Sequence, residues 1–136
     1  MIAFFDASAL IYLVEGAQPF ARRVRGEVAR LLKEHQIIDT AVSRLSWLEC
    51  RVKPARDEDL DILLQFDSFF ARPGLSWLEL TREVVELATV IRVRHHLRTP
   101  DALQAACCLQ LGSDHVFITG DSAFKKVSSL NARVLH

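Results

Sequence analysis

The feature that most constrains this chain is a repeated alternation of short apolar runs with longer amphipathic segments. Ile2–Phe5 and His115–Thr119 are continuously apolar or nearly so, as expected for strands that are buried on both faces. Phe20–Glu34 instead carries apolar residues at helical spacing beside a basic outer face. The alternation predicts βαβ units, and therefore an α/β fold with a mostly parallel, twisted sheet and helices on both faces.

The remaining segments follow the same alternation. Further strands are predicted at 36–41 and 75–80, with a small edge strand at 132–135. Ser43 and Thr81 are predicted N-caps of helices that run to about 52 and 94. Thr99, as N-cap, followed by Pro100 and Asp101, predicts another helix start. The other predicted helices cover 7–14, 57–71 and a short stretch after Asp121.

Composition limits the class of protein. A length of 136 residues predicts one domain, residues 1–136. The 17 basic and 17 acidic side chains give a formal net charge of zero, which excludes a uniformly basic protein of the histone type but allows local basic patches. We expect no membrane segment and no signal peptide. The three cysteines suit neither a disulfide framework nor a zinc site, so we expect a reduced, cytoplasmic protein.

Three acidic residues are predicted to meet at one edge of the sheet. Asp6 directly follows the first predicted strand, and Asp121 follows the strand at 115–119 after one glycine. Asp101 lies in the first turn of the helix that leads back to that strand. Ligands of parallel α/β sheets bind at the carboxyl ends of the strands. Taken alone, Asp6 is as readily a helix cap as a ligand, and Asp101 is better explained as a first-turn charge than as a ligand. Asp121 alone is also explained as a cap of the helix that follows it.

Glu49 is a fourth candidate, inside a helix. It shares a helical face with Leu45 and Val52, so we expect it to point toward the core. A charged group there is costly unless it is paired or bound to a cation. Four gathered acids would also repel one another, and Mg²⁺ or Mn²⁺, which prefer oxygen ligands, would relieve that repulsion. Together the acids predict a site for one of these ions.

Four segments carry these acids, and in this order they resemble the motifs of PIN-domain ribonucleases, in particular the small VapC-type toxins of toxin–antitoxin pairs. The segments read Phe-Asp-Ala-Ser-Ala-Leu at 5–10, Ser-Arg-Leu-Ser-Trp-Leu-Glu at 43–49, Thr-Pro-Asp-Ala-Leu-Gln-Ala-Ala at 99–106 and Phe-Ile-Thr-Gly-Asp-Ser-Ala-Phe at 117–124. The resemblance covers nearly the whole chain. One departure is Gly120, where the family often carries a polar side chain.

The resemblance implies a PIN-like three-layer sandwich and an endoribonuclease that depends on Mg²⁺ or Mn²⁺. It implies four catalytic and metal-binding acids, Asp6, Glu49, Asp101 and Asp121, with Ser8 and Thr119 as supporting hydroxyls. In such a site water attacks the phosphodiester in line and leaves a 5′-phosphate. The resemblance also implies a toxin that inhibits translation by cutting a structured RNA, a cognate antitoxin that blocks the active site, and a homodimer. We expect the antitoxin to cover apolar residues on the predicted helices at 57–71 and 81–94.

Basic residues near the acids are candidates for RNA binding. Arg94 and Arg98 belong to a basic cluster shortly before Asp101, and Lys125 follows Asp121. Such side chains bind RNA phosphates, although a solvated helix face is the ordinary explanation for a basic cluster.

Other functions remain open at this level. The chain is alternatively a catalytically inactive PIN-like module that binds RNA or protein, or a housekeeping RNA-processing nuclease. A receiver-type phosphoacceptor domain is disfavoured because the first strand has no acidic neighbours beside Asp6. A phosphatase of the haloacid dehalogenase type is disfavoured because it needs a second aspartate where this chain has Ser8.

Overall fold

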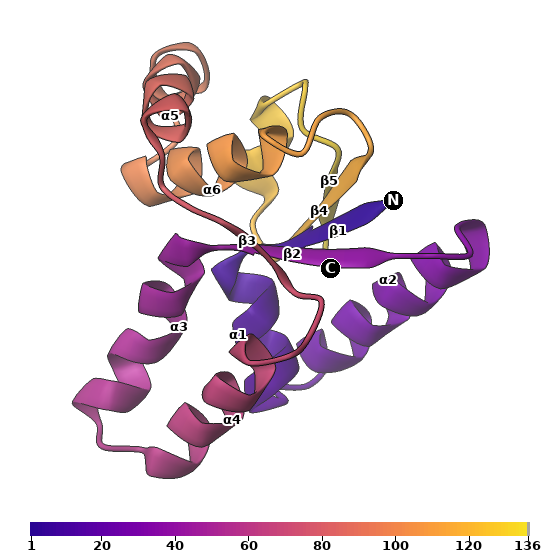
Figure 1. The fold of residues 1–136 in the computed structure, drawn as a ribbon, viewed down its shortest axis with the longest axis vertical. Coiled ribbons are helices and arrows are strands. Elements are labelled where there is room, and N and C mark those ends of the chain that lie inside the picture. Colours follow the sequence, from indigo (N-terminus) through magenta and orange to yellow (C-terminus); the bar gives the residue numbers. More distant parts are fainter. Residues whose placement is uncertain (136) are drawn as a thin grey trace.

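Five parallel strands form one sheet in the computed structural model, which describes residues 1–135. Their order is β3-β2-β1-β4-β5, and each neighbouring pair is parallel (Figure 1). The strands are β1 (Ile2–Phe5), β2 (Asp39–Ser43), β3 (Ser76–Leu78), β4 (His115–Thr119) and β5 (Ala132–Val134). The chain moves from β1 to β2 on one side, and β4 later joins β1 on the other. The strand order therefore reverses between β1 and β4, where α/β proteins bind their ligands.

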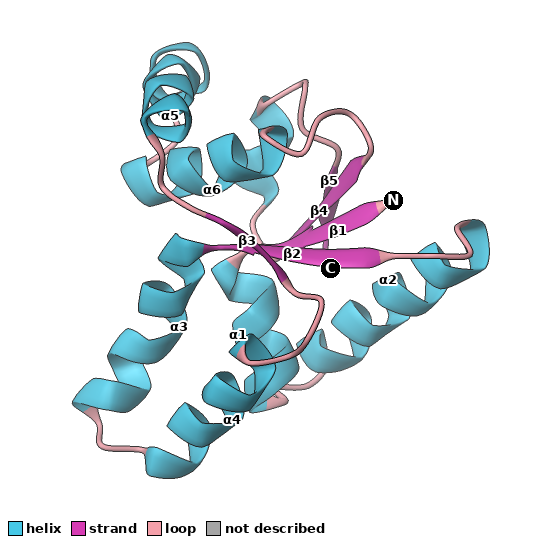
Figure 2. Cartoon of the chain, viewed as in Figure 1, coloured by secondary structure: helices cyan, strands magenta, loops and turns pink. Residues whose placement is uncertain are grey.

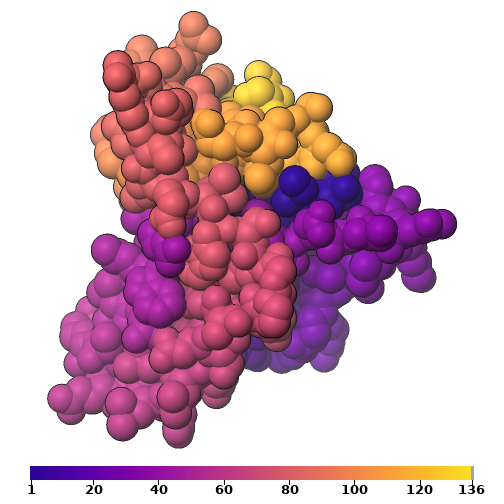
Figure 3. Space-filling model, viewed as in Figure 1, coloured from indigo at the N-terminus to yellow at the C-terminus, as the bar shows by residue number. Residues whose placement is uncertain are grey.

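Helices cover both faces of the sheet (Figure 2). One face carries α1 (Ala7–Glu15), α2 (Phe20–Glu34), α3 (Arg44–Arg56) and α4 (Leu60–Phe70), and the other carries α5 (Arg82–His95), α6 (Thr99–Leu109) and the short 3₁₀ helix η1 (Ser122–Lys126). In the space-filling view the α3–α4 hairpin and α5 lie at opposite ends of the molecule (Figure 3). The predicted three-layer α/β arrangement is confirmed.

Each face of the sheet has its own hydrophobic core. Phe5 packs with Leu10 and Phe66 on the side of α1 and α4, whereas Phe4 packs with Phe117 on the side of α5 and α6. Successive side chains of a strand point to opposite faces, so an uninterrupted apolar run in β1 serves both cores. Both faces of β1 and β4 are thus buried, which explains why these strands appear as continuous apolar runs in the sequence.

The structure confirms the predicted bounds of β1, β4 and α2 and corrects those of β2. The second strand was predicted at 36–41 but runs over Asp39–Ser43. The apolar side chain of Ile37 favoured the earlier start, yet this residue is 75% exposed. The buried part of the strand is instead Ala41 to Ser43, whose last residue also caps α3.

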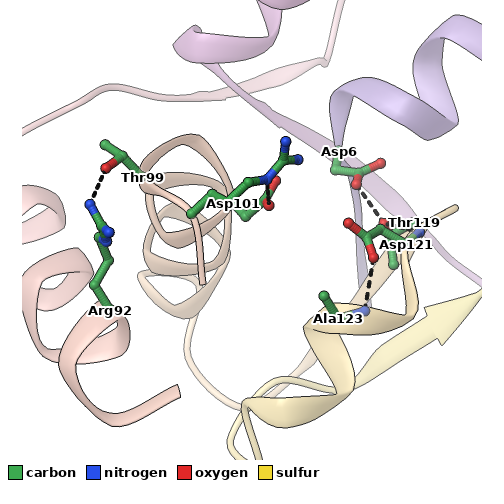
Figure 4. A network of polar contacts seen from close by, with 8 residues as sticks. Asp6, Arg92, Thr99, Asp101, Thr119, Asp121 and Ala123 are labelled. Atoms are coloured by element: carbon green, nitrogen blue, oxygen red, sulfur yellow. Dashed lines mark hydrogen bonds and ion pairs between the residues drawn. The ribbon is translucent and has the colours of Figure 1, made fainter. Parts of the chain in front are cut away.

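Side-chain caps define several helix starts. The hydroxyls of Ser43 and Thr81 accept hydrogen bonds from backbone N–H groups three residues later, as predicted. The predicted cap at Thr99 is wrong: α6 begins at Thr99 itself, and Arg98 is the N-cap residue. The Thr99 hydroxyl is engaged elsewhere, because it accepts a hydrogen bond from Arg92 Nη1 at 2.5 Å (Figure 4).

Within residues 1–135 no helix has both the length and the apolar character needed to cross a membrane. The predicted domain of residues 1–136 ends at His136, which lies outside the described residues.

Candidate active site

The four predicted acids line one pocket at the carboxyl ends of the strands. Asp6 directly follows β1, and Asp121 follows its neighbour β4 after one residue. Asp101 lies in the first turn of α6, and Glu49 lies in the middle of α3. These elements enclose a pocket of about 250 Å³ to which all four carboxylates contribute. A larger groove of about 600 Å³ between α5 and α6 is mostly apolar and has no acidic residue in its lining.

Asp6 is the most rigidly held of the four acids. Its Oδ1 accepts hydrogen bonds from Ser8 Oγ at 2.7 Å and from Ala9 N at 3.0 Å. Its Oδ2 accepts one from Thr119 Oγ1 at 2.5 Å (Figure 4). The side chain is only 5% exposed, and burial raises its pKa to about 6, although these three hydrogen bonds act in the opposite direction. The predicted hydroxyls of Ser8 and Thr119 thus both contact Asp6.

The same two hydroxyls connect Asp6 to the loop after β4. Ser8 Oγ accepts a hydrogen bond from Gly120 N, and Thr119 Oγ1 accepts one from Asp121 N, each at 3.0 Å. Asp121 in turn caps η1, since its Oδ1 accepts a hydrogen bond from Ala123 N at 2.9 Å (Figure 4). Asp121 both caps η1 and lines the pocket, because the cap uses only one of its two carboxylate oxygens.

The structure gives a steric reason for Gly120. A Cβ at this position would lie 2.7 Å from Cε2 of Tyr12 and 2.9 Å from its hydroxyl oxygen. Real Cβ atoms do not approach other carbons so closely, so the Tyr12 ring occupies the space that a side chain at 120 would need. A side chain at position 120, which the resemblance led us to expect, would therefore require Tyr12 to move.

Asp101 is paired with an arginine of the same chain. Arg98 Nε lies 3.0 Å from Asp101 Oδ2, and the arginine side chain is 78% exposed while that of Asp101 is largely buried. The hydrogen bond to Asp101 raises the pKa of Arg98, as do the more distant charges of Asp121 and Glu49. The guanidinium thus lies within the field of three of the four acids and partly balances their charge.

Glu49 reaches the pocket from a face of α3 different from the one predicted. The sequence placed it on an apolar face with Val52, but Val52 is 51% exposed. The buried residues of α3 are Ser46, Cys50 and Pro54. The helix turns small side chains toward the interior, and Glu49 lies half-buried at the margin of this stripe. Burial raises the pKa of Glu49 above its ordinary value, a hydrogen bond from Gln104 lowers it, and Asp101 raises it further.

Gln104 is a pocket residue that the sequence analysis missed. It lies one turn after Asp101 on α6, and its Nε2 donates a hydrogen bond to Glu49 Oε1 at 2.8 Å. The signal available in the sequence was a lone polar residue among the small residues Ala102, Ala105 and Ala106. Only the tertiary structure brings this residue to Glu49, which is 55 positions away in the chain.

The predicted RNA-binding residues lie in different places. Arg98 lines the pocket itself. Arg94, in the last turn of α5, and Lys125, in η1, are exposed and do not line it. The structure therefore brings one of the three candidate basic side chains to the acids.

The oxygen donors of the pocket suit a hard divalent cation. Four carboxylates and one guanidinium line it, so the charge is negative when the acids are ionised. Among residues 1–135, no three Asp, Glu, His or Cys side chains lie close enough together to hold one ion directly. In many proteins Mg²⁺ keeps several of its waters and is bound by only one or two carboxylates. A pocket of this volume with separated acids fits an ion of that kind in hydrated form.

Known structures with the same fold come from several bacteria. VapBC2 from Rickettsia felis, bound to a DNA fragment from its promoter, has a chain that matches with a TM-score of 0.75 and 13% identity over 100% of both chains. A toxin–antitoxin complex from Klebsiella pneumoniae matches with a TM-score of 0.69 and 20% identity over 98% of each chain. VapBC-1 from nontypeable Haemophilus influenzae gives 0.68 and 16% identity over 99% of this chain and 98% of that one.

Sequence comparison gives a family but no individual relative. No curated protein matches the chain in sequence. The family model of the PIN domain matches residues 3–130, a span that includes all four pocket acids, most of β1 and the whole of β2, β3 and β4. With the parallel sheet and the acids at its carboxyl edge, this match shows that the chain belongs to the PIN domain family.

Proposed function

We propose that this chain is an endoribonuclease that hydrolyses RNA phosphodiesters with the help of Mg²⁺ or Mn²⁺. The observation that carries the proposal is the pocket in which four carboxylates from separate segments of a PIN domain face a common space. A cluster of acids without a cation is unfavourable, because burial and mutual repulsion both disfavour the ionised state. A binding-only module has no need for such a cluster, so the pocket supports a catalytic function over that alternative.

In the proposed site each acid faces the ion from a different element of the fold. A bound divalent ion supplies Lewis-acid chemistry, which polarises the phosphate and stabilises charge on the leaving oxygen. Asp6, fixed by three hydrogen bonds, would hold the ion from the sheet edge. Glu49 and Asp101 would face the ion from α3 and α6 and would bind it directly or through its waters, because no three acids of the described residues lie close enough to bind one ion directly. Asp121 would contribute through the oxygen that does not cap η1.

Arg98 is the proposed phosphate contact. Its exposed guanidinium lines the pocket and is bound to Asp101. An exposed ion pair of this kind is weak, so the arginine is free to turn toward an RNA phosphate when Asp101 binds the ion. Arg94 and Lys125, which lie outside the pocket, are proposed to contact the RNA backbone farther from the cleaved bond.

We further propose that the enzyme is the cytoplasmic toxin of a toxin–antitoxin pair, that it inhibits translation, and that it forms a homodimer. The structures with the same fold support this, since two of them are VapBC proteins and one is described as a toxin–antitoxin complex. The chain also exposes apolar side chains, among them Leu60 and Leu64 on α4 and Val93 on α5. Partner proteins would cover such side chains in the proposed complex.

Cleavage of structured RNA by the purified protein tests the catalytic proposal. The wild type should cleave with Mg²⁺ or Mn²⁺, stop when EDTA is added, and leave 5′-phosphate ends. Asp101→Asn should lose about 10²-fold or more in rate, because it removes a metal-binding charge. Asp67→Asn is a matched control: Asp67 is also paired with an arginine, Arg51, but lies outside the pocket.

Three results would contradict the catalytic proposal: cleavage that persists in EDTA, equal rates for Asp101→Asn and wild type, or equal losses in Asp101→Asn and Asp67→Asn. The toxin proposal needs a separate test in cells. Expression of the chain should arrest growth, and coexpression of its proposed cognate antitoxin should restore it. Growth that continues normally during expression of the active enzyme would favour a housekeeping nuclease.

A further inference from the structure

Gln104 is a buried polar side chain whose hydrogen-bonding groups are all directed at one segment of the chain. It is 2% exposed, on a helix whose neighbouring buried residues are alanine and cysteine. Its Nε2 donates to Ser46 Oγ at 2.9 Å and to Glu49 Oε1 at 2.8 Å. Its Oε1 accepts a hydrogen bond from Ser43 Oγ at 3.0 Å. Both amide protons and the carbonyl oxygen are therefore used.

The orientation of the amide is determined by Glu49. The two serine hydroxyls can rotate, so either of them can donate to or accept from the amide. An ionised carboxylate is only an acceptor, so the group that faces Glu49 must be the NH₂ rather than the carbonyl oxygen. Ser43 donates to the carbonyl end of the amide, and Ser46 accepts the second hydrogen bond of its NH₂ group. Ser43 Oγ in turn accepts a hydrogen bond from Ser46 N. The result is a connected network that leads from the end of β2 to one pocket acid.

This arrangement matters because glutamate is a long, flexible side chain. Glu49 is half-buried at the margin of the pocket, and Gln104 is the neighbour that the structure shows bound to its carboxylate. Gln104 engages Oε1, which leaves Oε2 for a ligand in the pocket. An apolar residue would fill the same volume between the helices, but it would not orient the carboxylate. Groups that orient metal ligands from behind commonly change metal affinity by about 10–100-fold.

We propose that Gln104 is a positioning residue that holds the Glu49 carboxylate ready for the divalent ion. The proposal rests on the proposed function, in which Glu49 is one of the ion's ligands. Gln104 does not itself contact the ion or the RNA; it acts through Glu49.

The test measures Mn²⁺ affinity by titration calorimetry, independently of RNA cleavage. Gln104→Met keeps a side chain of similar length but removes both donors, and it should weaken Mn²⁺ binding about 10–100-fold. Gln110→Met is the matched control, because Gln110 lies just after the same helix and donates only to the carbonyl of Ala106. It should bind Mn²⁺ like the wild type. Unfolding in EDTA, measured for each protein, separates lost stability from lost affinity.

A double-mutant cycle distinguishes positioning from general damage. In a Glu49→Gln background, Gln104→Met should cause almost no further loss of Mn²⁺ affinity, because the group through which it acts is already changed. If Gln104→Met does not fold, Gln104→Asn serves as the second variant. It keeps a polar amide but is one methylene shorter, which withdraws the donor from Glu49, so it should weaken binding in the same direction.

Several results would overturn the proposal. Unchanged Mn²⁺ affinity in the Gln104 variants would show that Glu49 needs no such partner. Equal losses with and without the Glu49 substitution would show that the substitution distorts the pocket as a whole. If the wild type itself binds no Mn²⁺, the proposed function fails, and the role of Gln104 fails with it; the first two results overturn the role of Gln104 alone.

Discussion

Replacing Asp6 by asparagine should stabilise the metal-free protein at neutral pH. The carboxylate is almost fully buried, and burial raises its pKa from 3.8 to about 6 despite hydrogen bonds from Thr119, Ala9 and Ser8. In EDTA at pH 7.5 the folded protein must therefore keep an unfavourable buried charge. Asparagine has the same shape without that charge, so its unfolding should require more free energy than that of the wild type.

The expected gain follows from the pKa shift. A shift of one unit corresponds to about 1.4 kcal/mol, so the ionised form of Asp6 destabilises the fold by roughly 3 kcal/mol relative to the neutral form. The NH₂ of asparagine faces Thr119 Oγ1, whose hydroxyl must then turn away, and this offsets about 1 kcal/mol. The net gain is about 2 kcal/mol at pH 7.5, or about 8 °C in Tm for a chain of this size.

The gain in unfolding free energy of Asp6→Asn over wild type should grow as the pH rises. Because the pKa of Asp6 is higher in the folded than in the unfolded protein, the folded state binds more protons between about pH 4 and 6. The wild type should therefore lose stability as the pH rises through this range, and the raised pKa of Glu49 acts in the same direction in both proteins. The difference between Asp6→Asn and wild type should almost vanish near pH 4.

Urea unfolding in EDTA between pH 4 and 8 measures this difference. Asp39→Asn, the same change at an exposed aspartate, should show no comparable dependence on pH. An Asp6→Asn variant that is less stable than wild type at pH 7.5 would show that the buried charge of Asp6 does not destabilise the fold. A difference between the two proteins that is the same at every pH would show the same.

Three further predictions follow from other parts of the structure. All three cysteines are buried, and burial raises their thiol pKa values, that of Cys107 to about 12, so Ellman's reagent should label none of them until the protein unfolds. Gly120→Ser should lower the free energy of unfolding by about 1–3 kcal/mol, because the new side chain overpacks against Tyr12. The loss should be much smaller in a Tyr12→Ala background, and urea unfolding with and without the serine in each background measures both losses. Replacing Arg94 and Arg98 together by alanine should weaken RNA binding and flatten its dependence on salt with little change in Tm; an unchanged slope of log affinity against log salt would contradict their proposed contacts.

The sequence predicts the sheet well where burial is complete. β1 and β4 are covered on both faces, so their residues form apolar runs whose bounds are visible without any structure. β2 is exposed at its beginning, and the nearby Ile37 shifted the prediction toward the N-terminus. Helix starts were predicted correctly at Ser43 and Thr81, whose hydroxyl oxygens accept a backbone N–H of the helix, but not at Thr99, whose hydroxyl oxygen accepts from Arg92 instead.

Three acids of the pocket, Asp6, Asp101 and Asp121, were predictable because they follow strands or open a helix, and those positions depend only on topology. Their partners were not. Gln104 reaches Glu49 through the packing of α6 against α3, which the local pattern does not specify. Arg98 lies only three residues before Asp101, but it was predicted as an RNA contact and not as the ion-pair partner of that acid. The predicted face of α3 was wrong for a related reason. Its interior stripe is made of the small residues Ser46 and Cys50, whereas the apolar Val52 lies at the surface.

Anomalous diffraction at the manganese edge, from crystals soaked in Mn²⁺, shows whether the pocket acids bind a divalent ion. We expect an anomalous peak inside the pocket, with oxygens of Asp6 and Asp101 in the coordination shell of the ion, either directly or through one water. The peak should be absent from crystals of Asp6→Asn treated in the same way. No peak in the wild-type pocket, or a peak only at sites remote from these acids, would contradict a divalent-ion site in the pocket.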